Sequence, residues 1–205
     1  MMLKKLFLLL LVIVHFSENS LADDRKAYQV GDTIMEFKLK NIDGKFKALN
    51  DYKSEKGIIL IFTCNHCPFS VAYEDRIIAL HKKYSGLGFP VVAINPNDDK
   101  AYPLDSYENM IERAQEKGFT FDYLHDETQE VAKTFGATNT PHVFIVSNQQ
   151  SYFKVEYIGA IDDNSYEPQS VKHRHVENAI DQLNKNIPIT VTKTKALGCS
   201  IKWKK

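Results

Sequence analysis

Residues 57–68 read GIILIFTCNHCP. The five consecutive apolar residues Ile58–Phe62 are typical of a strand that is buried on both faces of a sheet. A helical pattern of apolar residues follows over about 70–84, and a second apolar run covers 89–94. A strand, a helix and a second strand in this order predict a parallel pair joined by a right-handed crossover. The expected fold class is therefore α/β.

The flanking sequence continues this pattern. Two short alternating runs, Phe37–Leu39 and Phe46–Leu49, enclose the turn Asn41–Gly44 and predict a β-hairpin. Further helices are expected at 107–117, 128–135 and 171–183, and further strands at 121–124, 142–146 and 152–158.

Cys64 and Cys67 are separated by two residues, a spacing used by redox dithiols and by metal knuckles. A structural zinc site needs two further ligands, and Cys199 is the one remaining cysteine. Amide groups at the start of the following helix favour a thiolate beside Cys64. We therefore expect a redox pair in which an exposed Cys64 attacks and a shielded Cys67 resolves the mixed disulfide. A structural disulfide is the third alternative.

The residues around the two cysteines support the same interpretation. Pro68 suits the first position of a helix, where its missing N–H needs no partner. His66 is either a surface histidine or a tuning residue that stabilises the Cys64 thiolate and makes the pair more oxidising. Asn65 is expected to matter less.

The first 22 residues have the features of a signal peptide. Lys4 and Lys5 precede an apolar run, Leu6–Phe16, and Ser20-Leu21-Ala22 forms a small-x-small cleavage site. The alternative is an uncleaved anchor, although the run is shorter than the roughly 20 residues of a spanning helix. The protein is therefore expected to be exported, either periplasmic or secreted. If the signal segment stays uncleaved, the membrane contact would be through residues 1–22 alone.

Size and charge limit the remaining possibilities. The chain has 205 residues, long enough to bury a core without disulfides. We expect a signal peptide at 1–22, one domain at 23–187 and a C-terminal tail at 188–205. Lys and Arg together number 26, as do Asp and Glu, so there is no electrostatic case for nucleic-acid binding.

Three separated features resemble the thioredoxin superfamily, in particular exported AhpC/TSA-redoxin and TlpA-like proteins. They are the N-terminal hairpin with Gly31-Asp32, the strand–CxxCP–helix unit, and the turn Gly136–Pro141 before an apolar strand. The similarity covers about residues 30–185. It implies a thioredoxin-like fold, a mixed sheet flanked by helices, with an N-terminal hairpin and a C-terminal extension.

The resemblance also implies a chemistry. Pro141 would be cis and would face the two cysteines, and Thr140 would pair its backbone with a bound substrate chain. The reaction would be thiol–disulfide exchange with exported proteins. It would require an unidentified redox partner that resets the cysteine pair, and neither a diffusible cofactor nor a metal.

The sequence departs from the family pattern at three places. No Trp precedes Cys64, and no acidic residue interrupts Ile58–Phe62, where many thioredoxins carry a buried carboxylate. The peroxiredoxin signature P-x-x-x-T-x-x-C is also missing. A typical peroxiredoxin mechanism is therefore not expected.

Several alternatives remain. Cys199 is either a third redox thiol or a small buried apolar residue. A copper-binding thioredoxin-fold protein would use the two cysteines with His125 or His142 as a third ligand. Acidic loop residues at 98–99 and 162–164 offer oxygen ligands for Ca²⁺, although Asx-rich turns usually need no metal. A non-enzymatic binding domain is the remaining alternative.

Overall fold

The computed structural model describes residues 27–205, so the predicted signal peptide lies outside the described residues. The strands are β1 (Thr33–Ile34), β2 (Lys38–Asn41), β3 (Phe46–Ala48), β4 (Gly57–Phe62), β5 (Val91–Asn95), β6 (Asp122–His125), β7 (Asn139–Thr140), β8 (His142–Asn148), β9 (Phe153–Gly159) and β10 (Cys199–Ser200). The helices are α1 (Pro68–Tyr84), α2 (Tyr107–Lys117), α3 (Glu130–Phe135) and α4 (His175–Asn184), and η3 (Pro103–Asp105) is a short 3-10 turn.

A mixed sheet forms the centre of the molecule, with the strand order β1-β9-β8-β4-β5-β6-β2-β3. Strand β4 pairs in parallel with β5, and β5 with β6, as the strand–helix–strand pattern predicts. The N-terminal hairpin is confirmed, since β2 and β3 pair antiparallel. A separate small sheet joins β7 to β10 at the C-terminus.

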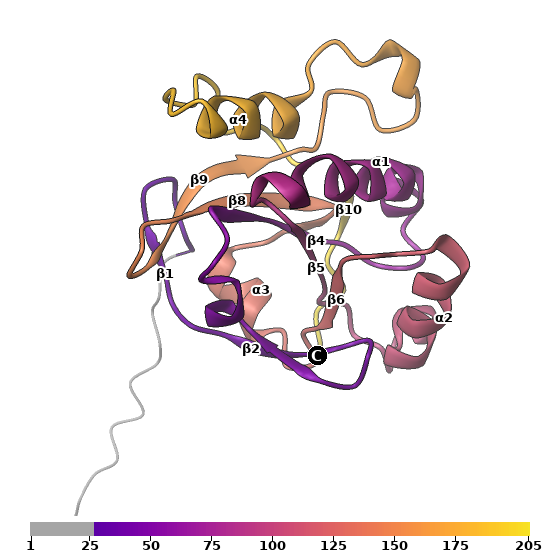
Figure 1. The fold of residues 1–205 in the computed structure, drawn as a ribbon. Coiled ribbons are helices and arrows are strands. Elements are labelled where there is room, and N and C mark those ends of the chain that lie inside the picture. Colours follow the sequence, from indigo (N-terminus) through magenta and orange to yellow (C-terminus); the bar gives the residue numbers. More distant parts are fainter. Residues whose placement is uncertain (1–26) are drawn as a thin grey trace, which may run out of the picture.

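The sheet separates two hydrophobic layers (Figure 1). Ile58, Leu60 and Phe62 of β4 belong to the layer on the α3 side, whereas Ile59 and Ile61 belong to the layer covered by α1 and α4. All six residues of β4 are buried. Burial on both faces explains the uninterrupted apolar run in the sequence. It also holds the end of β4, where the cysteine motif begins, in a fixed position.

Element boundaries differ from the predictions at two helices. Helix α1 begins at Pro68, the first helical residue, and not near residue 70, because proline is preorganised for that position. Helix α4 begins at His175 instead of residue 171, because residues 168–170 form a separate 3-10 turn.

None of the helices within residues 27–205 is long and apolar enough to cross a lipid bilayer.

Candidate active site

The cysteine motif connects the end of β4 to the start of α1. Cys67 is the N-cap residue of α1, and its carbonyl oxygen accepts the N–H of Val71 at 2.9 Å. Pro68 occupies the first helical position, as the sequence predicts. Helix α1 therefore begins directly after Cys67, and a backbone hydrogen bond from Cys67 lowers the pKa of Cys64.

Both cysteine side chains are buried, contrary to the prediction of an exposed Cys64. Cys64 is 3% exposed and Cys67 is 2% exposed, and both are free thiols. The Cys64 sulfur lies 3.3 Å from the hydroxyl oxygen of Thr140 and 3.7 Å from that of Ser70. The Cys67 sulfur lies 3.2 Å from the carbonyl oxygen of Thr140. Thr140 thus contacts both sulfurs.

The pKa values of the two cysteines move in opposite directions: that of Cys67 is lowered and that of Cys64 is raised. A hydrogen bond from the Cys64 thiol is the main reason that the pKa of Cys67 is lowered from 9.0 to about 4. The N–H groups of Ser70 and Cys199 lower it further. The pKa of Cys64 is raised, first by its hydrogen bond to Cys67, then by burial and by the charge of Asp105. The CxxCP motif predicted the anion on Cys64. The thiolate on Cys64 stays a prediction, and the directions of the two pKa shifts favour Cys67.

Asp105 is a site residue that the sequence analysis missed. Its carboxylate is fully buried at the end of η3. It accepts the backbone N–H of Asn65 at 2.8 Å and the side-chain amide of Asn97 at 2.7 Å. Strand β4 itself contains no acidic residue. The buried carboxylate is instead supplied by the loop that follows β5.

His66 lies between this carboxylate and the surface. Its Nδ1 is 2.6 Å from Asp105 Oδ2, and its ring stacks on Tyr102 with centroids 5.7 Å apart. The ligand atoms of Cys64, His66 and Asp105 all lie within 4.8 Å of one another. His66 is therefore placed to influence Cys64, as the tuning prediction requires.

Asn65 is more important for the shape of the site than the sequence analysis expected. Its side chain donates to the carbonyl oxygen of Leu104 and accepts the hydroxyl of Tyr123, each at 2.9 Å. Together with the bond from its N–H to Asp105, these contacts fix the loop between the two cysteines.

The Thr140–Pro141 peptide bond is cis, as the resemblance implied. Thr140 is in β7, and β7 pairs antiparallel with β10 of the same chain. Cys199 is the register partner of Thr140, and it is partly buried. The C-terminal tail therefore covers the cysteine pair.

The copper alternative expected His125 or His142 beside the cysteines. Among the described residues, the one group with metal-ligand geometry is Cys64, His66 and Asp105, which includes neither histidine. His142 accepts the N–H of Thr138 at 3.3 Å, and burial lowers its pKa to about 4. The arrangement does not favour the copper alternative. Of the loop clusters considered for calcium, Asp162 is occupied by an ion pair with Arg76 at 2.7 Å.

A family model described as the AhpC/TSA family matches residues 30–163. The chain belongs to the AhpC/TSA family. This result confirms the resemblance drawn from the hairpin, the cysteine motif and the proline turn.

Similar proteins extend the comparison beyond the AhpC/TSA model. The thiol-disulfide oxidoreductase ResA of Oceanobacillus iheyensis is 27% identical over 146 residues, 69% of this chain and 71% of its own length. A structure described as an uncharacterized conserved protein from Geobacillus kaustophilus is 38% identical, with a TM-score of 0.79, over 86% of this chain and 93% of its own. A candidate thiol:disulfide interchange protein DsbE from Chlorobium tepidum has a TM-score of 0.60 at 18% identity and covers 77% of this chain and 99% of its own. The fold is therefore thioredoxin-like, as expected.

Proposed function

We propose that this protein is a thiol–disulfide oxidoreductase that exchanges its Cys64–Cys67 dithiol with disulfides of exported proteins. One observation carries the proposal: both cysteine sulfurs contact Thr140 where α1 begins, and interaction with Cys64 lowers the pKa of Cys67. A thiolate with a second thiol in contact is the arrangement that thiol–disulfide exchange requires. The likeness to the oxidoreductase ResA supports the same chemistry.

We assign the roles of the two cysteines from the directions of their pKa shifts. The Cys67 thiolate attacks one sulfur of a substrate disulfide, a new S–S bond forms, and the other substrate sulfur leaves as a thiolate. Cys64 then attacks the Cys67 sulfur, forming the Cys64–Cys67 disulfide and releasing the second substrate thiolate. The side chains of His66 and Asp105, whose ligand atoms lie within 4.8 Å of the Cys64 sulfur, are in place to take the proton that Cys64 gives up.

The edge of β7 is the proposed binding position of the substrate backbone. Thr140 on this edge contacts both cysteine sulfurs, and in this protein the edge pairs with an extended segment. An extended substrate peptide can form the same backbone hydrogen bonds. An upstream redox partner, not identified by the sequence, would reset the cysteine pair.

We place this activity outside the cytoplasm, because residues 1–22 have the charge and apolar pattern of a signal peptide. Disulfides persist and are exchanged in such compartments.

Oxidised glutathione, a small peptide disulfide, provides the test. The reduced protein should form the Cys64–Cys67 disulfide and release two molecules of glutathione. The double variant Cys64→Ser, Cys199→Ser should stop at a mixed disulfide, with one glutathione bound to Cys67 and detected by mass spectrometry. The matched variant Cys67→Ser, Cys199→Ser should bind far less.

Two outcomes would contradict the proposal. A wild-type protein that stays fully reduced in excess oxidised glutathione is no oxidoreductase of this kind. An adduct that forms on Cys64 in the Cys67→Ser, Cys199→Ser protein as readily as on Cys67 would exclude the assigned roles.

A further inference from the structure

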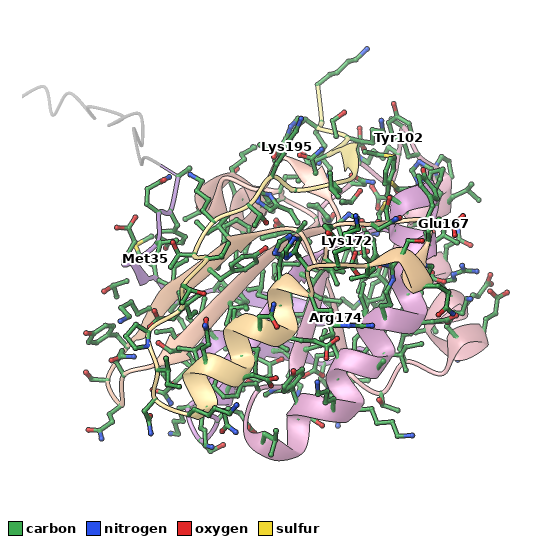
Figure 2. All side chains as sticks on the ribbon, turned by 90° about the horizontal axis from the view of Figure 1, so that it is seen from above. Met35, Tyr102, Glu167, Lys172, Arg174 and Lys195 are labelled. Carbon is green, nitrogen blue, oxygen red and sulfur yellow. The ribbon has the colours of Figure 1, made fainter. Side chains whose placement is uncertain are left out.

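The C-terminal tail follows an extended path across the molecule. It passes β9, where the N–H of Ile158 donates to the carbonyl oxygen of Thr192 and the N–H of Thr194 donates to that of Ile158, each at 3.0 Å. It then continues past Lys195 toward the side of the molecule that carries Tyr102 (Figure 2). None of the side chains at 190–200 is buried, whereas Ile201 is 4% exposed and belongs to the core. The segment before Ile201 is thus held by these backbone contacts and by the hydrogen bonds of the Thr194 hydroxyl to Tyr157 and Ala160.

The tail meets the active site through strand β10. Cys199 is paired with Thr140, and the N–H of Ile201 donates to the carbonyl oxygen of Thr138 at 3.0 Å. The side-chain amide of Asn139 donates to the carbonyl oxygen of Gly198 at 2.9 Å. Strand β10 therefore occupies the edge of β7 that the proposed function assigns to a substrate backbone.

Gly198 allows this close approach. A Cβ atom at this position would lie 2.3 Å from the carbonyl oxygen of Thr140 and 2.9 Å from the nitrogen of Pro141. No side chain fits there without displacing backbone, so the glycine is required for β10 to reach the edge.

The Cys199 side chain brings a third sulfur to the pair. Cys199 is the register partner of Thr140, whose carbonyl oxygen lies 3.2 Å from the Cys67 sulfur, and interaction with Cys199 lowers the pKa of Cys67. Cys67 therefore has a sulfur neighbour on each of two segments. An attacking thiol and a leaving thiol that both contact one central sulfur are what an exchange reaction needs.

We propose that residues 198–201 are an internal substrate strand and that Cys199 exchanges with the Cys64–Cys67 disulfide by attacking the Cys67 sulfur. The Cys67–Cys199 bond forms, the Cys64–Cys67 bond breaks, and Cys64 leaves as a thiolate that takes up the proton from Cys199. The exchange conserves electrons and needs no oxidant. The inference rests on the proposed function, since it concerns the same dithiol.

The tail would then control access to the site. Because β10 covers the β7 edge and both cysteines are almost fully buried, an external polypeptide must displace the tail before it can react. The Cys67–Cys199 disulfide locks the covered state, and its reduction permits opening.

Disulfide mapping of the purified Cys64→Ser protein tests the exchange. With oxidised glutathione as the oxidant, Cys67 and Cys199 should join and two molecules of glutathione should be released. Cleavage after Lys and Arg should then yield residues 57–76 covalently linked to residues 196–202. The Cys67→Ser protein is the matched control and should yield no link between Cys64 and Cys199.

A glycine pair tests the covering role of the tail. Gly198→Ala should raise the rate at which iodoacetamide alkylates Cys67 by about tenfold, the equivalent of about 1.4 kcal/mol. Gly86→Ala, at a position where a Cβ meets no atom within 4 Å, should leave the rate unchanged. Unchanged circular dichroism spectra would show that both variants are folded. If Gly198→Ala does not fold, the disulfide map of the Cys64→Ser protein tests the inference instead.

Either of two results overturns the inference: a Cys64→Ser protein that yields no 57–76 to 196–202 link, or a folded Gly198→Ala protein alkylated no faster than Gly86→Ala. These failures are distinct from failure of the proposed function. The glutathione adduct on Cys67 in the double variant, which lacks Cys199, does not depend on the tail thiol.

Discussion

Replacement of Cys64 by Ala should raise the pKa of Cys67. The hydrogen bond from the Cys64 thiol is the largest of the interactions that lower the pKa of Cys67 from 9.0 to about 4. At pH 7 a thiol with a pKa of 9.0 is about 1% ionised, whereas one with a pKa of about 4 is about 99.9% ionised. The reduced wild-type protein should therefore carry one thiolate per molecule at neutral pH, located on Cys67.

Thiolate absorbance at 240 nm, followed from pH 3 to pH 10, measures this directly. The wild-type protein should show a first transition near pH 4, and Cys64→Ala should move it upward. Cys199→Ala should cause a smaller upward shift, since the Cys199 thiol contributes less than the Cys64 thiol. The Cys67→Ser protein should lose the acidic transition altogether.

The order of these effects makes the reasoning refutable. If the acidic transition persists in Cys67→Ser, the anion belongs to Cys64 and the role of the helix N-cap is misassigned. If Cys199→Ala shifts the transition more than Cys64→Ala does, the tail thiol rather than the second cysteine of the motif is the main hydrogen-bond donor.

Two further predictions concern buried polar groups. Asp105→Ala leaves the N–H of Asn65 and the amide of Asn97 without their buried acceptor, which should lower the free energy of unfolding by about 2–6 kcal/mol in urea titration. Asp105→Asn keeps one acceptor oxygen and should lower it less. Equal losses in the two variants would contradict this account. Burial lowers the pKa of His142 from 6.5 to about 4, so the unfolded chain binds a proton at higher pH than the folded protein does. Stability should fall by roughly 3 kcal/mol as the pH decreases from about 6.5 to about 4. A His142→Gln protein with the same pH dependence of the urea midpoint would disprove this contribution.

The central elements of the fold were predictable because their signals are local. The apolar run Ile58–Phe62, the helix start at Pro68 and the hairpin before them each follow from a few adjacent residues. The cysteine pair was recognisable for the same reason, since two residues separate its members. The cis bond before Pro141 was anticipated from the family resemblance of its turn.

Three features of the site depended on contacts between distant segments. Asp105 lies 40 residues from Asn65, which it holds, and its local sequence resembles an ordinary polar loop. The pairing of Cys199 with Thr140 joins two-residue strands too short to show a period-2 pattern. The lowered pKa of Cys67 depends on hydrogen bonds from the Cys64 thiol and from the backbone N–H groups of Ser70 and Cys199. These groups belong to separate segments of the chain.

The difference between the features that local sequence predicted and those that only the tertiary structure showed has a physical reason. Strand burial and helix starts depend on the periodicity and the stereochemistry of neighbouring residues, which are properties of the chain alone. Proton location and access to the sulfurs depend on short-range interactions among groups from β4, the loop after β5, β7 and the C-terminal tail. Only the folded chain brings those groups within hydrogen-bonding distance, so the sequence indicated the reacting atoms and the tertiary structure decided their charge and their cover.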